Sequence, residues 1–181
     1  MLKDCRLDEN TIIVFSGDHG DMLGERGLWY KMSFFEHSAR VPLFVHYPPR
    51  FAARRVTRNV STLDILPTLV DLVGAKLIPS LPLDGLSLLP HLQGEPGHDT
   101  VFGEYCGEGT IAPVMMIRRG DWKYITCPAD GDQLFNLRSD PMELFNLAVT
   151  GADSEGKTLY SVLLCVLENT PFVSHSLQPF R

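Results

Sequence analysis

Two short apolar runs indicate strands in the first half of the chain. Residues 11–15 read TIIVF and residues 41–47 read VPLFVHY. Continuous runs of this length, rich in β-branched residues, are typical of strands that are buried on both faces of a parallel sheet. The pattern therefore predicts an α/β protein with helices above and below a largely parallel sheet.

One amphipathic helix is predicted within STLDILPTLVDLVG, which begins at Ser61. Its apolar positions recur at helical spacing, and Gly74 is a terminator. Ser61, Thr62 and Asp64 are cap candidates. Asp64 is preferred as the N-cap because Pro67 then falls in the first turn, where its missing amide hydrogen is not needed. The following stretch, LPLDGLSLLPHLQGE, predicts a glycine-containing turn and a short helix.

The second half of the chain predicts a small antiparallel element. VFGEY at 101–105 is a strand candidate, and PVMMIRRGDWKYIT at 113–126 predicts a hairpin that turns at residues 119–121. From residue 149 the sequence changes: LYSVLLCVL has no polar face, and no clear period follows it. We therefore expect an α/β region at 1–100, an antiparallel subdomain at 101–148 and a divergent tail at 149–181.

Composition excludes several classes of protein. Hydrophobic residues make up 44% and charged residues 21% of the 181 residues, as in globular domains. The net charge of −6 opposes nonspecific binding to nucleic acid or anionic membranes. We expect a soluble cytoplasmic protein, because signal-peptide and membrane-span patterns are missing and the four cysteines show no C-x-x-C spacing.

The strongest candidate for chemistry follows the first predicted strand. Asp18 and His19 lie between Gly17 and Gly20, which permit a sharp turn that brings the two side chains together. A carboxylate oxygen and an imidazole nitrogen can both bind a divalent cation, although two ligands do not complete a site. The alternative is that Asp18 caps a turn and His19 bonds to the backbone, and on spacing alone the two interpretations are equally supported.

Lys31 and His37 lie further along the same segment. Lys31 stands among aromatic residues, where it is either a point charge for an anionic oxygen or a solvated surface lysine. From the residues alone the solvated lysine is favoured. For His37 we favour a hydrogen-bonded loop histidine over a substrate contact.

Five ordered segments resemble the C-terminal part of the type I sulfatases of the alkaline phosphatase superfamily, most closely the bacterial choline-sulfatases. They are TIIVFSGDHGDMLGERGLWYKMSFFEHSARVPL, STLDILPTLVDLVGA, LDGLSLLPHLQGE, GDWKYI and LFNLRSDPMELFNLA. The resemblance covers about residues 1–148. The resemblance implies an alkaline-phosphatase-like sandwich with a mostly parallel sheet and a small antiparallel C-terminal subdomain.

The resemblance also implies roles for particular residues. Asp18 and His19 would bind a divalent metal, calcium before manganese or magnesium, and Lys31 would contact the sulfate oxygens as the catalytic charge. Glu108 of EYCGEG would face the quaternary ammonium of choline O-sulfate, with Tyr105 as a second candidate for that pocket or as a buried strand residue. A trimethylammonium group donates no ordinary hydrogen bonds, so a carboxylate and aromatic faces suit it.

The family's nucleophile is not encoded in this chain. A formylglycine forms from a C/S-x-P/A-x-R motif, and Cys5, Cys106, Cys127 and Cys165 all lack it. We therefore expect a C-terminal portion that is inactive alone, whereas the complete enzyme would be a homo-oligomer. An aryl sulfatase, a phosphonate or phosphate monoester hydrolase and a noncatalytic remnant are the alternatives.

Overall fold

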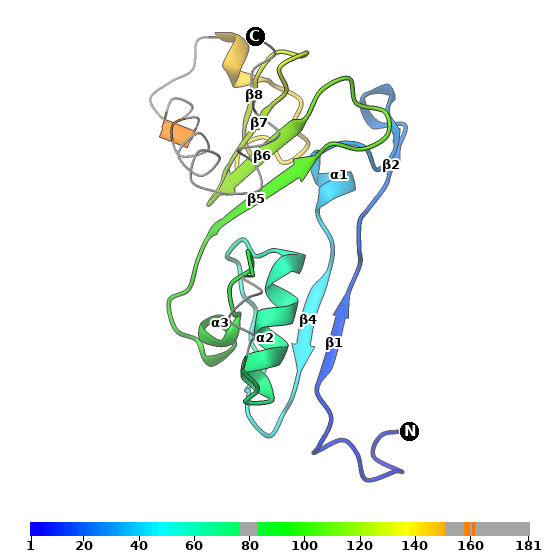
Figure 1. The fold of residues 1–181 in the computed structure, drawn as a ribbon, viewed down its shortest axis with the longest axis vertical. Helices are drawn as coiled ribbons and strands as arrows, with labels where there is room; N and C mark the ends of the chain where they lie inside the picture. The colour runs from blue at the N-terminus through cyan, green and yellow to red at the C-terminus, as the bar shows by residue number, and fades with distance from the viewer. Residues whose placement is uncertain (77–82, 151–157, 160, 162–181) are drawn as a thin grey trace. The chain divides into compact units, whose positions relative to one another are not determined.

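The computed structural model describes residues 1–76, 83–150, 158–159 and 161. They form two compact units: residues 1–20 with 40–99, and residues 21–39 with the described residues from 100 onward (Figure 1). In chain order the elements are β1 (Ile13–Ser16), β2 (Met22–Leu23), η1 (Glu25–Gly27), β3 (Trp29–Tyr30), α1 (Glu36–Ala39), β4 (Leu43–His46), η2 (Thr62–Asp64), α2 (Ile65–Leu72), α3 (Leu89–Gln93), β5 (Thr100–Tyr105), β6 (Val114–Arg119), β7 (Trp122–Thr126), β8 (Gln133–Asn136) and η3 (Leu147–Thr150).

In the first unit, β1 and β4 form a two-stranded antiparallel sheet. Phe15 lies opposite Phe44, their rings stack with centroids 5.1 Å apart, and each residue is 52% exposed. The predicted strands are confirmed, but burial on both faces and parallel pairing are wrong for the described residues. A continuous apolar run indicates burial, and its association with parallel sheets is statistical, so it does not fix strand direction.

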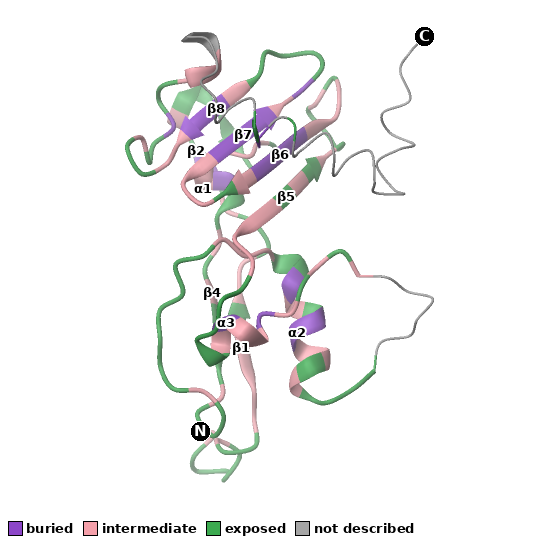
Figure 2. Ribbon diagram, turned by 90° about the vertical axis from the view of Figure 1, so that its left-hand side faces the viewer, coloured by how far each residue is buried: buried purple, intermediate pink, exposed green. Residues whose placement is uncertain are grey.

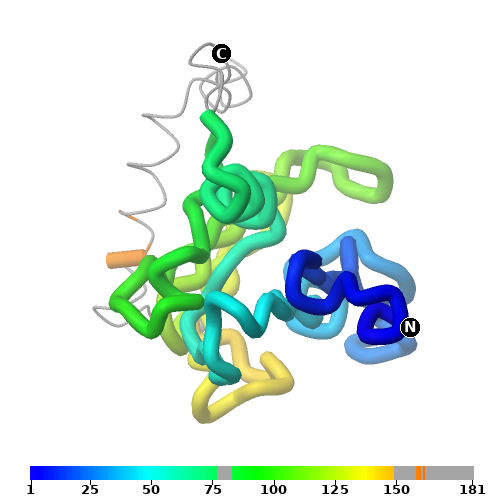
Figure 3. Tube along the Cα trace, turned by 90° about the horizontal axis from the view of Figure 1, so that it is seen from below, coloured from blue at the N-terminus to red at the C-terminus, as the bar shows by residue number. Residues whose placement is uncertain are grey.

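The predicted amphipathic helix is confirmed as η2 followed by α2. Its N-terminus has a capping box, in which the Ser61 side chain accepts the Leu63 amide and the Asp64 side chain accepts the Ser61 amide. Asp64 is the N-cap of α2, as predicted, but the side-chain capping bond is made by Ser61 at the start of η2. The helix ends as predicted at Gly74 (φ 65°), where the Gly74 and Ala75 amides donate to carbonyls of the last turn. Figure 3 shows α2 nearly end-on.

Asp64 also organises the residues that follow the helix. Its side chain is 3% exposed, and its Oδ1 accepts the Leu86 amide at 2.8 Å. Its Oδ2 lies 2.9 Å from Nε2 of His98. These contacts tie the start of α2 to the segments on both sides of α3, the predicted short helix. Figure 1 shows both helices on the β4 side of the strand pair.

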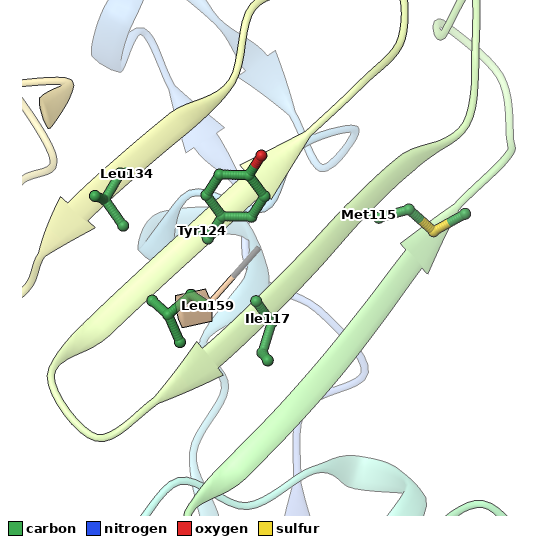
Figure 4. Packing of buried hydrophobic residues seen from close by; sticks show 5 residues of the cluster. All are labelled: Met115, Ile117, Tyr124, Leu134 and Leu159. Atoms are coloured by element: carbon green, nitrogen blue, oxygen red, sulfur yellow. The ribbon is translucent and has the colours of Figure 1, made fainter. Parts of the chain in front are cut away.

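The second unit is built on a four-stranded antiparallel sheet in the order β5-β6-β7-β8. The predicted strand and hairpin are confirmed, and the β6–β7 turn contains Gly120 with φ 56°. Side chains alternate between the two faces, and Figure 2 shows that the buried residues concentrate in β6, β7 and β8. On one face Met115, Ile117, Tyr124, Leu134 and Leu159 form a core cluster (Figure 4).

The opposite face of this sheet is covered by residues 21–39. Met116, Ile125 and Phe135 form its buried cluster, and Phe34 and Phe35 pack against them. Gly103 in β5 allows the close approach of Phe34, because an added Cβ would overlap the aromatic ring. Arg26 lies over the ring of Phe35, 4.2 Å from its centroid. The segment that carries Lys31 is thus part of the core of the second unit.

The domain boundaries expected at residues 100 and 148 stay predictions. The packing adds that residues 21–39, expected within the first region, pack with the antiparallel sheet. Most of the divergent tail lies outside the described residues. Within the part of the chain that the structure describes, no helix has the length and apolarity needed to cross a membrane.

Candidate functional site

Lys31 follows a short hairpin formed by β2 and β3. The hairpin is held by Met22, which is 1% exposed and lies opposite Tyr30. The Lys31 carbonyl accepts both the Ser38 hydroxyl at 2.7 Å and the Ser33 amide at 2.9 Å. Tyr30 has φ 69°, a conformation that a non-glycine residue adopts only when the surroundings enforce it. The backbone of Lys31 is therefore fixed, while its side chain lies at the surface.

The loop that carries Glu108 is fixed by Tyr105. The Tyr105 hydroxyl donates to the Glu108 carbonyl at 2.7 Å, and the ring lies so close to Gly107 that an added Cβ would be 3.0 Å from it. Thr110 donates to the Gly107 carbonyl at 2.9 Å. The Glu108 side chain is exposed. Tyr105 is the last residue of β5 and is half-buried, so the strand position is confirmed and full burial is not.

The structure brings the Lys31 and Glu108 segments together. Gly109 has φ 86°, and a Cβ at this position would lie 3.7 Å from the side chain of Met32. The loops next to Lys31 and Glu108 therefore approach closely enough that one added methyl group at Gly109 would contact Met32. A cationic and an anionic side chain therefore extend from adjacent loops of the second unit.

Asp18 and His19 lie together in the first unit. The Asp18 carboxylate accepts the His19 amide at 3.0 Å, and Nδ1 of His19 lies 2.7 Å from the Gly20 carbonyl. Nε2 of His19 is 3.5 Å from Oδ2 of Asp18. The local bonds expected from the turn alternative are thus present. They are equally the bonds of a metal-binding histidine, because a backbone carbonyl at Nδ1 orients Nε2 as the ligand.

These two donors fit a divalent cation but are not a complete site. A carboxylate oxygen and an imidazole nitrogen are suitable ligands. Among the residues described, no group of three or more His, Cys, Asp or Glu side chains is arranged to hold a metal ion. Further ligands would have to come from other residues. His37 lies half-buried in α1 and not in a loop as expected.

Four charged residues that the sequence did not single out support the Lys31 segment. Lys123 Nζ contacts Oε1 of Glu36 at 2.6 Å and Oε1 of Glu143 at 2.8 Å, and Arg118 bonds both Glu36 oxygens at 2.7 Å. Burial by itself would raise the pKa of Glu36, but Lys123 and Arg118 outweigh it and the pKa is lowered. The sequence held one indication of this cluster: in the predicted hairpin, alternation places Lys123 on the same face of the sheet as Ile125.

One cysteine lies near the Glu108 loop without features of a nucleophile. Burial, together with the nearby Glu104 carboxylate, raises the pKa of the Cys106 thiol. Its Sγ donates to Oε1 of Glu104 at 3.3 Å. Since the thiolate is the reactive form, Cys106 is not an activated nucleophile.

Comparison with known proteins shows what this arrangement resembles. Residues 1–75 match the Sulfatase family model. The chain is 49% identical over 148 residues to a choline-sulfatase of Rhizobium meliloti (strain 1021), covering 81% of this chain and 29% of that protein. The resemblance to the sulfatases is confirmed. An arylsulfatase K of Gallus gallus is 36% identical over 193 residues, covering 99% of this chain and 35% of that protein.

Solved structures agree with the sulfatase assignment of the fold. The phosphonate monoester hydrolase of Agrobacterium radiobacter superposes with a TM-score of 0.78 at 32% identity, covering 92% of this chain and 36% of that chain. A sulfatase from Bacteroides fragilis, described as putative, superposes with a TM-score of 0.83 over 97% of this chain and 40% of that chain, and the alkaline-phosphatase-like α/β class is confirmed. The chain spans only about a third of the length of the sulfatase relatives reported above.

Proposed function

We propose that this chain supplies part of the active site of a choline-sulfatase, which hydrolyses choline O-sulfate to choline and sulfate. The observation that carries the proposal is the adjacency of the Lys31 and Glu108 segments through Met32 and Gly109. A zwitterionic substrate has an anionic sulfate and a cationic ammonium a few bonds apart, and these two loops offer opposite charges. The 49% identity to a choline-sulfatase supports the same substrate.

Each residue has a defined task in this proposal. Lys31 binds the sulfate oxygens and offsets the negative charge that grows on the leaving oxygen in the transition state. Glu108 binds the trimethylammonium group through its carboxylate. Tyr105 positions the Glu108 loop through the hydrogen bond from its hydroxyl to the Glu108 carbonyl.

Asp18 and His19 would hold a divalent cation, with calcium first and manganese or magnesium as alternatives. When bound, the cation supplies Lewis-acid polarisation of a sulfate oxygen. The contribution of this chain is the orientation of the two ligands, since Nδ1 of His19 is fixed by the Gly20 carbonyl. The remaining ligands would come from other parts of the complete enzyme.

The formylglycine nucleophile would also come from outside these 181 residues, because no C/S-x-P/A-x-R motif occurs in them. Charge stabilisation without an attacking group gives no covalent step. The isolated chain is therefore expected to release no sulfate. Activity would require an N-terminal portion of a sulfatase.

Glu108 gives the test of the substrate. The chain is mixed with a separately expressed N-terminal portion of the Rhizobium meliloti enzyme, and sulfate release from choline O-sulfate and from an aryl sulfate is compared. We expect Glu108→Gln to lower kcat/KM for choline O-sulfate by about 100-fold and that for the aryl ester by less than about threefold. Glu95→Gln, an exposed carboxylate in the first unit, is the control.

A second candidate is an aryl sulfatase or a phosphonate monoester hydrolase. It is favoured by the 36% identity to arylsulfatase K and by the superposition on the phosphonate monoester hydrolase. Equal losses on both substrates in Glu108→Gln would support this candidate and contradict the choline assignment. Failure of every mixture to release sulfate would instead favour a noncatalytic remnant.

A further inference from the structure

A charged cluster lies partly buried where the Lys31 segment meets the four-stranded sheet. The cluster consists of Glu36, Arg118, Lys123 and Glu143, with two positive and two negative charges. Lys123 and Glu143 are each 1% exposed. Arg118 and Lys123 are direct cross-strand partners, so their two like charges lie side by side on one face of the sheet. Glu36 contacts both of them and offsets that repulsion.

Stability alone does not explain this cluster. Desolvating charges costs about as much as their attraction returns, and apolar replacements of similar volume are often as stable. The local pattern around Glu143 is also the reverse of ordinary burial: Glu143 is inside, whereas its neighbours Met142 and Leu144 are 49% and 63% exposed. Glu143 further adopts φ 56°, a strained conformation for a non-glycine residue. Such local conflicts occur where a side chain has a functional task.

The bonds of this cluster lead from the sheet to Lys31. Lys123 Nζ donates to the Phe34 carbonyl at 2.8 Å, and Oε2 of Glu143 accepts the Glu36 amide at 2.7 Å. Both bonds fix the start of α1. From the same helix, Ser38, which is 2% exposed, donates to the Lys31 carbonyl.

We infer that Lys123 and Glu143 are positioning residues for Lys31. They bind the Phe34 carbonyl and the Glu36 amide, on either side of Phe35, and so fix the position of α1. Ser38 of α1 in turn binds the Lys31 carbonyl. The anion-binding ammonium of Lys31 is thereby held in place by a buried ion pair that never touches the substrate. This role rests on the proposed function of Lys31 as the sulfate contact. A displacement of about 1 Å at such a group can cost about 100-fold in rate.

Amide hydrogen exchange of the 181-residue chain tests the mechanical part of the inference. Glu143→Gln keeps the shape of the side chain and removes its charge. We expect the amides of residues 31–39 to exchange at least about tenfold faster, while those of the β6–β7 hairpin keep their protection. Arg138→Gln, which breaks an exposed ion pair with Asp121, is the control and should change neither segment. Unchanged exchange in residues 31–39 would overturn the inference.

A purely structural role would loosen both segments together. Uniform loss of protection in Glu143→Gln and also in the milder Glu143→Asp would therefore contradict a positioning role. The Asp variant keeps the charge and shortens the reach, so it serves where the Gln variant fails to fold.

A double-mutant cycle tests the connection to Lys31. In the mixture with the N-terminal portion, we expect Glu143→Gln to lower kcat by about 10- to 100-fold with little change in KM, and to have almost no effect in a Lys31→Ala background. An equal loss in both backgrounds would show that Glu143 does not act through Lys31. If the wild-type mixture releases no sulfate, the proposed function fails, and the exchange pattern still decides the positioning role.

Discussion

The Lys123 ammonium lies 2.8 Å from the Glu143 carboxylate, and neither side chain reaches solvent appreciably. Lys123 comes from the middle of β7, whereas Glu143 comes from the segment after β8. Glu36 at the start of α1 also contacts the Lys123 ammonium, at 2.6 Å. This pair therefore joins the segment that carries Lys31 to the sheet beneath it.

Truncation of one member of this pair is expected to be costly. Lys123→Met leaves the Glu36 and Glu143 carboxylates buried without their common partner, and we expect it to lower the free energy of unfolding by about 3–5 kcal/mol. Urea denaturation followed by circular dichroism measures the change. Arg138→Gln removes one partner of an exposed ion pair and should cost less than about 1 kcal/mol. Equal costs would contradict a special role for the buried pair.

The stability of the second unit should depend on acid pH through Glu36. Its pKa is lowered from the ordinary 4.5, so the unfolded chain binds more protons in the window below that value. The contribution of Glu36 is therefore fully present above pH 4.5 and is lost as the pH falls through the lowered pKa. Urea midpoints measured from pH 6 to pH 3 should fall less steeply in Glu36→Gln than in the wild type. An identical slope in the two proteins would contradict this pKa direction.

The capping box predicts a moderate effect in the first unit. Ser61→Ala removes the side-chain acceptor for the Leu63 amide and should destabilise the chain by about 1 kcal/mol. Thr62→Ala changes an exposed neighbouring position and is the matched control. Thermal or urea unfolding of both variants gives the comparison. A larger loss of stability in Thr62→Ala than in Ser61→Ala would contradict the assignment of Ser61 as the cap.

Tyr105→Phe separates two possible roles of this ring. The substitution keeps the aromatic face and removes the bond to the Glu108 carbonyl. If Tyr105 positions the loop, kcat/KM for choline O-sulfate should fall about fivefold to tenfold in the reconstituted enzyme, because one neutral hydrogen bond is lost. In that case Tyr105→Leu should have a kcat/KM no higher than that of Tyr105→Phe. Full activity of the Phe variant would contradict the positioning role, and full activity of Phe together with a loss in Leu would indicate that the ring itself contacts the ammonium group.

Short-range patterns predicted much of the fold. The α2 helix, its glycine terminus, the β6–β7 hairpin and the α3 helix follow from spacing and turn residues that act locally. The antiparallel pairing of β1 with β4 did not, because a continuous apolar run indicates burial and does not fix strand direction. The packing of residues 21–39 on the sheet depends on contacts between positions about a hundred residues apart.

The candidate site divides in the same way. Asp18 with His19 could be expected from two flanking glycines, and their adjacency is confirmed. Glu36, Arg118, Lys123 and Glu143 could not, since each resembles an ordinary surface charge until the strand alternation and the turn at Glu143 are known. The roles of Asp18, His19, Lys31 and Glu108 in metal and substrate binding remain predictions.

Sulfate release is the most direct measurement of the central claim. The 181-residue chain is mixed with the N-terminal portion of the similar choline-sulfatase, and sulfate is measured after addition of choline O-sulfate, a divalent cation being present. We expect release by the wild-type mixture, a loss of at least about 100-fold in Lys31→Ala, and wild-type release in the control Lys3→Ala, which changes an exposed lysine. Release that is independent of Lys31, or no release from the wild-type mixture, would contradict the claim that this chain supplies a sulfatase active site.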